Sequence, residues 1–320
     1  MSVNTCADRS TFRLVVATNN TLRLLKYLIY ISEYESDRFH KVNKEIRACR
    51  NNYIKHGRSN CGNSFCLLCQ SKKLNHLRAK LNSTLLTYLT KDPIESKSII
   101  SVTLTVKSCE PKDIRSTLDQ LNQAIVTLCR RKSFPVTGYF RNNELTFNKN
   151  PKSDFYGLCH PHSHTLLAVD TSDPKARSFW SKDQTLYLRQ EFQKLLNLDY
   201  LPDIDYKTVL TGNDVGYLLT RMDMTGCKSL EQYKKHLTKD PNGYYSSPIT
   251  RESDTFATAS YLTKQSTKAL WIPESGFVKD IHADIMYNLL TTLDHLQLHS
   301  SSGSLELPTN KQVKTIKDFI

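Results

Sequence analysis

The segment that most constrains the fold runs from Cys159 to Val169, with the sequence CHPHSHTLLAV. Its second half, Leu166 to Val169, is apolar on both faces of an extended chain, which is typical of a central, buried strand. Residues two apart on a strand point to the same face, so His160, His162 and His164 line up with rises of about 7 Å between neighbours. Two of these imidazoles can close on one metal ion. Three histidines at this period, where a buried strand begins, favour a metal site or catalysis over ordinary core histidines.

Strand and helix patterns alternate around this segment. Alternation of apolar and polar residues predicts a strand over residues 98–107, and strand patterns are also expected over residues 137–147, 159–169 and 204–210. Apolar residues at helical spacing predict helices over residues 114–128, after Pro111, and over residues 179–198. A sheet with helices on one side is the expected fold.

The chain divides into three expected regions. Residues 1–95 form a basic N-terminal region with a cysteine knuckle at residues 49–69, followed by a leucine pattern that predicts a helix over residues 74–89. Residues 96–270 carry the alternating strands and helices together with the candidate chemistry. Residues 271–320 are expected to form a C-terminal helix, over about residues 278–298, and a polar tail. The serines and glycine from Ser300 to Gly303 predict a flexible break between the two.

Charge is concentrated in the N-terminal region. The chain has 44 Lys+Arg against 31 Asp+Glu, a net charge of +13, and residues 38–80 alone hold eleven Lys+Arg with one acid, Glu45. Such a field attracts polyanions, and nucleic acid is the expected partner, although a solvated, solubilising surface has the same composition. The most apolar stretch, residues 21–31, is too short to cross a bilayer, and the N-terminus lacks a secretory pattern. A cytoplasmic protein without a membrane partner is expected.

Four of the nine cysteines fall within 21 residues, a spacing typical of metal ligands in a reducing compartment. Cys61, Cys66 and Cys69 have the turn spacing that lets thiolates converge on one tetrahedral Zn²⁺. The fourth ligand is Cys49, with His56 or His76 as alternatives, and free thiols in a loop are the competing interpretation. A structural zinc would hold the surrounding Lys and Arg side chains in a fixed array.

A tyrosine and a lysine near residue 260 form a second candidate site. Tyr261 and Lys264 stand three positions apart, so on a helix they share a face and both can address one phosphate. Alone the pattern is weak, because Tyr261 is then an ordinary surface residue of an amphipathic helix. Together with the histidine strand it makes a coherent site.

Four elements stand in order along about residues 49–300: the cysteine knuckle followed by QSKK, the strand SVTLTVK, the strand YFRNNELTFN leading to HPHSHTLL, and the Tyr-x-x-Lys pair. This order resembles the single-tyrosine rolling-circle replication initiators of small bacterial plasmids, within the HUH endonuclease superfamily. The resemblance implies an α+β fold with an antiparallel central sheet, a ferredoxin-like core with helices on one side, and a small N-terminal zinc-binding segment.

The same resemblance implies a nickase of single-stranded or hairpin origin DNA. His162 and His164 would bind Mg²⁺ or Mn²⁺ with Glu144 as the third ligand, and His160 competes for that third place. Tyr261, assisted by Lys264, would attack the scissile phosphate to give a 5′-phosphotyrosyl DNA and a free 3′-hydroxyl. That hydroxyl would prime a host DNA polymerase after a host helicase is recruited. Basic residues expected to contact the DNA are Lys72, Lys73, Arg78 and Arg141.

One departure from the family pattern concerns the end of replication. A glutamate commonly lies four residues before the tyrosine and activates water, and here that position is Ala257. Tyr244 and Tyr245 could supply a second nucleophile; the competing interpretation is that they are two ordinary aromatic residues of a loop. Two other functions share these residues: a mobilisation relaxase or single-strand transposase with the same site, and a non-catalytic, zinc-stabilised nucleic-acid-binding protein.

Overall fold

The computed structural model describes residues 36–63, 66–148, 150, 152–228 and 298–314, with isolated positions outside these ranges. Tyr261, Lys264, Ala257, the tyrosine pair 244–245 and most of the predicted helix over 278–298 lie outside the described residues. Among the helices in the described part of the chain, none is long and apolar enough to cross a membrane.

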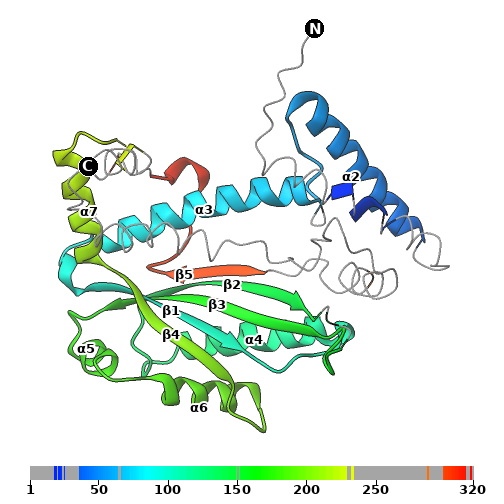
Figure 1. The fold of residues 1–320 in the computed structure, drawn as a ribbon. Helices are drawn as coiled ribbons and strands as arrows, with labels where there is room; N and C mark the ends of the chain where they lie inside the picture. The colour runs from blue at the N-terminus through cyan, green and yellow to red at the C-terminus, as the bar shows by residue number, and fades with distance from the viewer. Residues whose placement is uncertain are drawn as a thin grey trace.

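A five-stranded antiparallel sheet forms the centre of the molecule (Figure 1). Its strands are β1 (Lys97–Thr105), β2 (Gly138–Phe147), β3 (Cys159–Asp170), β4 (Asp203–Thr211) and β5 (His299–Gly303). They are ordered β4-β1-β3-β2-β5, and each hydrogen-bonded pair is antiparallel. The α+β class with an antiparallel sheet is therefore confirmed, and the histidine strand β3 is the middle strand, as its two apolar faces predict.

The described residues also form six helices: α2 (Ser36–His56), α3 (Leu67–Leu89), α4 (Ile114–Cys129), α5 (Pro174–Trp180), α6 (Thr185–Leu196) and α7 (Gly212–Met224). Short 3-10 turns lie at Ile94–Ser96, Pro111–Asp113 and Asn310–Gln312. The apolar stripe that predicts α4 is buried throughout. A capping box begins α7, where Thr211 and Asp214 satisfy each other's backbone N–H groups.

The helix predicted over residues 179–198 is two helices. α5 ends at Trp180 and α6 begins at Thr185, with Ser181 to Gln184 between them. The carboxylate of Asp183 accepts hydrogen bonds from the Thr185 backbone N–H at 2.9 Å and from the Tyr206 hydroxyl at 3.2 Å. An Asp side chain that accepts from the backbone N–H two residues later forms a turn, and this turn separates the two helices, which the apolar spacing alone does not show.

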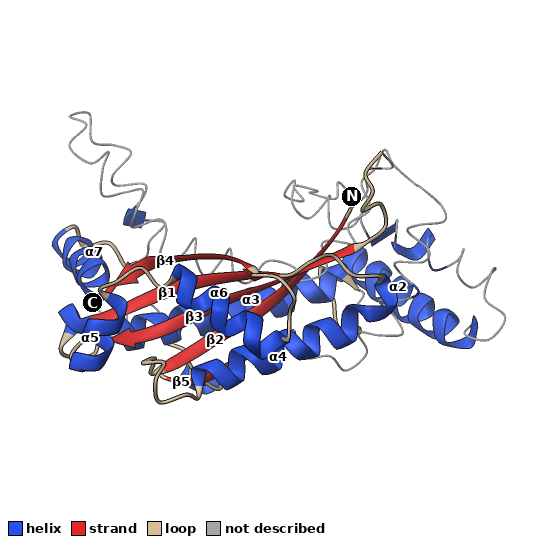
Figure 2. Cartoon of the chain, turned by 90° about the horizontal axis from the view of Figure 1, so that it is seen from below, coloured by secondary structure: helices blue, strands red, loops and turns tan. Residues whose placement is uncertain are grey.

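Helices cover both faces of the sheet, so the prediction of helices on one side is wrong. Figure 1 shows α3 across one face and α4 with α6 across the other, and Figure 2 shows the second face from below. The α3 leucines pack with Ile99, Phe140 and Leu166, whereas α4 and α6 pack with Val102 and Leu167. Neighbouring residues on a strand point to opposite faces, so a strand that is apolar on both faces needs cover on both.

The flexible break predicted at Ser300–Gly303 is also wrong, because these residues form β5. Serines 300–302 pair with β2 from Arg141 back to Tyr139. The guanidinium of Arg141 donates to the Ser300 hydroxyl from Nε at 3.2 Å and from Nη2 at 3.0 Å. A serine-rich segment satisfies its backbone here by completing the edge of the sheet, a contact with residues far away in the sequence.

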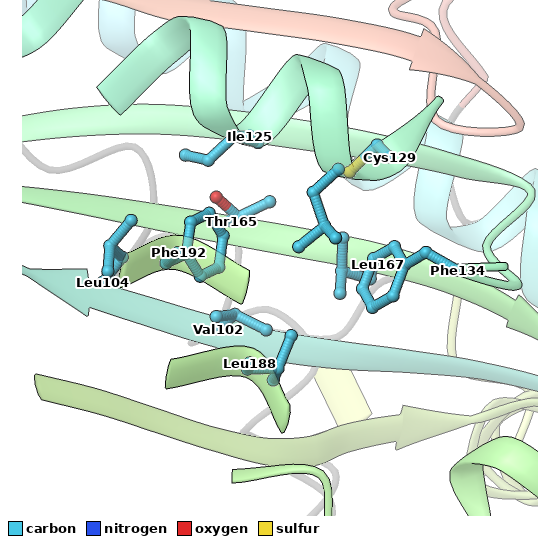
Figure 3. Close-up of a pocket in the computed structure, with 10 residues that line it drawn as sticks. Val102, Leu104, Ile125, Cys129, Phe134, Thr165, Leu167, Leu188 and Phe192 are labelled. Carbon is cyan, nitrogen blue, oxygen red and sulfur yellow. The ribbon is translucent and has the colours of Figure 1, made fainter. Parts of the chain in front are cut away.

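Between the sheet and α4 with α6 lies a cavity of about 10 Å³, drawn in Figure 3. Its lining is almost entirely apolar and includes Leu104, Ile125, Leu167 and Phe192. A space of this size is close to that of one water molecule, and an apolar lining leaves such a water without partners. It lies on the face opposite the histidine row and belongs to the core.

Candidate active site and metal cluster

The histidine row lies on the α3 side of the sheet, beyond the region that the α3 leucines cover. β3 places His164 opposite Thr103 of β1, and His162 opposite both Thr105 of β1 and Glu144 of β2. In an antiparallel sheet, residues directly opposite each other share a face. The register therefore gathers imidazoles, hydroxyls and a carboxylate on one face at the end of the sheet where β3 begins.

Each imidazole is bonded at the same ring nitrogen by a hydroxyl. Nδ1 of His162 lies 3.0 Å from Thr105 Oγ1, Nδ1 of His164 lies 3.2 Å from Thr103 Oγ1, and Nδ1 of His160 lies 3.0 Å from Ser108 Oγ. A hydroxyl that accepts from Nδ1–H leaves the lone pair on Nε2, which is the tautomer that binds a cation through Nε2. Sequence reasoning missed these hydroxyls, although Thr103 and Thr105 alternate at the same period of two as the histidines.

Glu144 contacts the histidine row directly. Its Oε2 lies 3.0 Å from Nε2 of His164, and both side chains are buried, with 7% and 5% exposed. The structure thus brings the predicted ligands Glu144 and His164 into contact, and the strand register places the third, His162, opposite Glu144. Imidazole nitrogens and a carboxylate are ligand types that can bind a divalent cation.

The spacing of the rings is uneven along the row. The ring centroids of His160 and His162 are 4.4 Å apart and edge to face, whereas those of His162 and His164 are 6.3 Å apart and stacked. Burial lowers the pKa of His160, which favours its neutral form. In the cysteine cluster described below, all ligand atoms lie within 4.8 Å of one another. The ligand atoms of Glu144 and the histidine row are spread more widely than this.

The four cysteines of the N-terminal region converge as predicted. Sγ of Cys69 lies 3.5 Å from Sγ of Cys49 and 3.5 Å from Sγ of Cys61, and Sγ of Cys66 lies 3.7 Å from that of Cys49. Across the described ranges, this is the group of three or more ligand side chains whose ligand atoms all lie within 4.8 Å of one another. Four thiols so placed can hold a metal ion such as zinc. The fourth member is Cys49, and the exposed His56 and His76 stand outside the cluster.

The cysteine cluster joins two helices. Cys49 lies in α2, Cys66 precedes α3 and Cys69 lies in its first turn, while the connecting loop turns at Gly62 with φ of +72°. Burial raises the pKa of Cys61 to about 12 and also raises that of Cys66, so burial alone favours the thiols. A bound cation reverses this preference because it stabilises the thiolates.

The predicted DNA-contact residues fall into two groups. Lys72 and Lys73 are exposed on α3 and Arg78 is partly exposed, close in sequence to the cysteine cluster. The α2 helix adds further exposed cations, Lys41, Lys44, Arg47 and Lys55. Arg141 differs, because it is 3% exposed and bonds Asn122 of α4 and Ser300 of β5. This placement gives Arg141 a packing role and does not support the prediction that it contacts DNA.

Comparison with known proteins gives a family for this arrangement. A family described as Replication protein matches residues 53–315. The chain belongs to this family of replication proteins. The match runs from α2 through the whole sheet, and so it includes the histidine strand and three of the four clustered cysteines.

A curated relative agrees with this family. The chain is 27% identical over 159 residues to "Protein rep" of Streptococcus pneumoniae serotype 2 (strain D39 / NCTC 7466). The similar region covers 47% of this chain and 45% of the relative, so it spans less than half of that protein. No solved structure matches the chain.

Proposed function

We propose that this protein initiates plasmid replication by nicking one strand of its origin DNA, with Tyr261 as the nucleophile. Membership of the replication protein family supports a role in replication over mobilisation or transposition. The observation that carries the nicking proposal is the row of His162 and His164 beside Glu144, with each Nδ1 engaged by a hydroxyl. The strand sequence β1-α4-β2-β3-α6-β4, in the order β4-β1-β3-β2, supports a ferredoxin-like core of the HUH type.

The chain's own residues would prepare the site in three ways. Thr105 would accept from Nδ1 of His162 and so leave its Nε2 lone pair for the cation, and Thr103 would do the same for His164 once a cation replaces the proton between its Nε2 and Glu144. Glu144 would add a negative charge that attracts a divalent cation to the imidazoles. The buried middle strand keeps all these groups in place, since neighbouring strands on both sides fix its backbone. When bound, Mg²⁺ or Mn²⁺ would withdraw charge from the oxygens of the scissile phosphate.

In the proposed reaction the Tyr261 oxygen attacks phosphorus and loses its phenolic proton. The bond from phosphorus to the 3′-oxygen breaks, and this oxygen takes up a proton to become the 3′-hydroxyl primer. The DNA 5′-phosphate stays on the tyrosine, which retains the phosphodiester energy for later religation. Free phenol has a pKa near 10, so attack at neutral pH needs a neighbouring positive charge, for which Lys264 is the proposed source.

Origin binding is proposed for the exposed cations of α2 and α3. The cysteine cluster ties these helices together, and a zinc ion there would fix the relative positions of Lys44, Lys72 and Lys73. Such an array binds phosphates, and its affinity should fall steeply with salt as counterions are released.

The test is covalent capture. Protein, Mn²⁺ and single-stranded DNA carrying the origin of its own replicon are incubated, and a protein–DNA adduct is sought on a denaturing gel, with the linked peptide identified by mass spectrometry. Wild type should form an adduct at Tyr261, and Tyr261→Phe should form none. Tyr217→Phe, on the exposed face of α7, is the matched control and should react as wild type does. An undiminished adduct in Tyr261→Phe overturns the assignment, and no adduct in wild type overturns the nicking proposal.

A further inference from the structure

Two neighbouring aromatic side chains point into solvent from the loop that joins β2 to β3. Phe155 is 57% exposed and Tyr156 is 36% exposed, and we call them the aromatic pair. Large apolar side chains at a loop tip contribute little to the core, and two of them side by side in solvent are typical of a binding surface. The last register pair of the two strands is Phe147 with Cys159, so the loop follows β2 directly and leads into the histidine row.

Hydrogen bonds within the loop hold the aromatic pair in place. Asn148 Nδ2 donates to Ser153 Oγ at 2.9 Å, and the same oxygen accepts from the Phe155 backbone N–H at 3.2 Å. Backbone bonds from Tyr156 to Ser153 and from Gly157 to Asn148 close the turn, both at 2.9 Å. A loop fixed in this way presents two rings without a large loss of entropy on binding.

The position of the pair relative to the histidines suggests what it binds. Phe155 and Tyr156 precede His162 by seven and six residues, and the turn that carries them ends at Cys159, where β3 and the histidine row begin. Lys152 is exposed in the same loop, and the exposed Lys107 follows β1 at this end of the sheet, with its Nζ 3.7 Å from Asp199 Oδ1. Unpaired bases have two flat faces that stack on aromatic rings whatever their sequence.

We infer that the aromatic pair is a stacking platform for unpaired bases of the DNA strand whose phosphate lies at the histidine row. The inference rests on the proposed function, and it adds a base-binding subsite beside the site of chemistry. Stacking would hold the strand in its unpaired form and fix which phosphate reaches His162 and His164. Its specificity would be for single strands over duplex, since the bases of a duplex offer no free faces.

The experiment measures binding without chemistry. Fluorescein-labelled oligothymidylate is titrated by anisotropy with the full chain, at fixed salt and without added Mg²⁺ or Mn²⁺. The Phe155→Ala/Tyr156→Ala variant should bind about tenfold more weakly or worse, as expected for loss of base stacking. Tyr217→Ala removes an aromatic side chain of similar exposure from α7. This helix follows β4 at the end of that strand away from the histidine row, so the variant should bind within about twofold of wild type.

An abasic oligonucleotide separates stacking from charge. Wild type should lose as much affinity on the abasic backbone as the double variant loses on oligothymidylate, and the double variant should be indifferent to the missing bases. The dependence of affinity on salt should stay the same in both proteins, since no phosphate contact is removed. Restoring rings with Phe155→Trp/Tyr156→Trp should restore binding, whereas Phe155→Leu/Tyr156→Leu should not.

Two outcomes overturn the inference: the alanine double variant binds oligothymidylate as tightly as wild type, or wild type binds the abasic backbone equally well. The first outcome would direct attention to a protein partner for this loop. These outcomes are independent of the covalent capture at Tyr261. If wild type forms the adduct and the double variant binds normally, the nicking proposal stands and the stacking inference fails. If no adduct forms but binding depends on the rings and the bases, the nicking proposal fails and base stacking by the aromatic pair stands.

Discussion

The hydroxyl behind His162 offers a sharp test of how the histidine row is prepared. Thr105→Val replaces the Oγ1 that lies 3.0 Å from Nδ1 of His162 with a methyl group of nearly the same size. Valine is also β-branched, so the strand conformation of β1 is kept. The substitution therefore removes one hydrogen bond and little else.

The expected size follows from the surroundings of the ring. In the cation-binding tautomer Nδ1 carries a proton, and valine leaves that N–H without its acceptor in a half-buried position. An unsatisfied group of this kind costs about 1–3 kcal/mol, and loss of a partner behind a metal-binding histidine typically costs about 10- to 100-fold in metal affinity.

The assay is the Mn²⁺ concentration that gives half-maximal adduct formation, with Mn²⁺ binding measured separately by electron paramagnetic resonance. Thr105→Val should raise that concentration about tenfold or more, while the rate at saturating Mn²⁺ stays close to wild type. Ser101→Ala is the matched control, since Ser101 lies on the same strand face opposite Leu166. Unchanged Mn²⁺ dependence in Thr105→Val, or an equal loss in Ser101→Ala, would refute the positioning role.

Three further outcomes are expected. Cys66→Ser should lower bound zinc, measured by atomic absorption, well below the wild-type content, and full metal content would contradict the four-thiol site. Burial raises the pKa of Asp170, but hydrogen bonds from Lys97 and nearby groups lower it more, so the pKa stays below its usual range. The carboxylate therefore stabilises the fold above about pH 4, and this contribution is lost as the pH falls. Asp170→Asn should then cost about 2–3 kcal/mol in urea unfolding at pH 7, less than a fully buried pair because Asp170 is partly exposed, and the difference from wild type should shrink in acid; a constant difference would rule this out. A hydrogen bond from Cys159 lowers the pKa of Cys109 to about 7, so alkylation of Cys109 should reach half its maximal rate near neutral pH, and Cys159→Ala should move that midpoint upward; an unmoved midpoint would disprove the coupling.

The sequence by itself determined the features that depend on short spacing. A period of two placed His160, His162 and His164 on one face of a strand, and a period of about three and a half placed the α4 stripe in the core. The cysteines of residues 49–69 also converge as their spacing predicts, because a short loop restricts where its thiols can lie relative to one another. Each of these features is set by neighbours along the chain, which is why pattern alone finds it.

Only the tertiary structure decided which distant residues meet. The register of β1 on β3 brought Thr103 and Thr105 behind the histidines, and the cover of α3 on the second face came from leucines outside the strand pattern. Arg141 is buried because α4 and β5 cover it, and Ser300 lies in an edge strand because β5 pairs with the backbone of β2. These contacts satisfy hydrogen bonds and bury surface between segments far apart in sequence, and local periodicity carries no information about that choice.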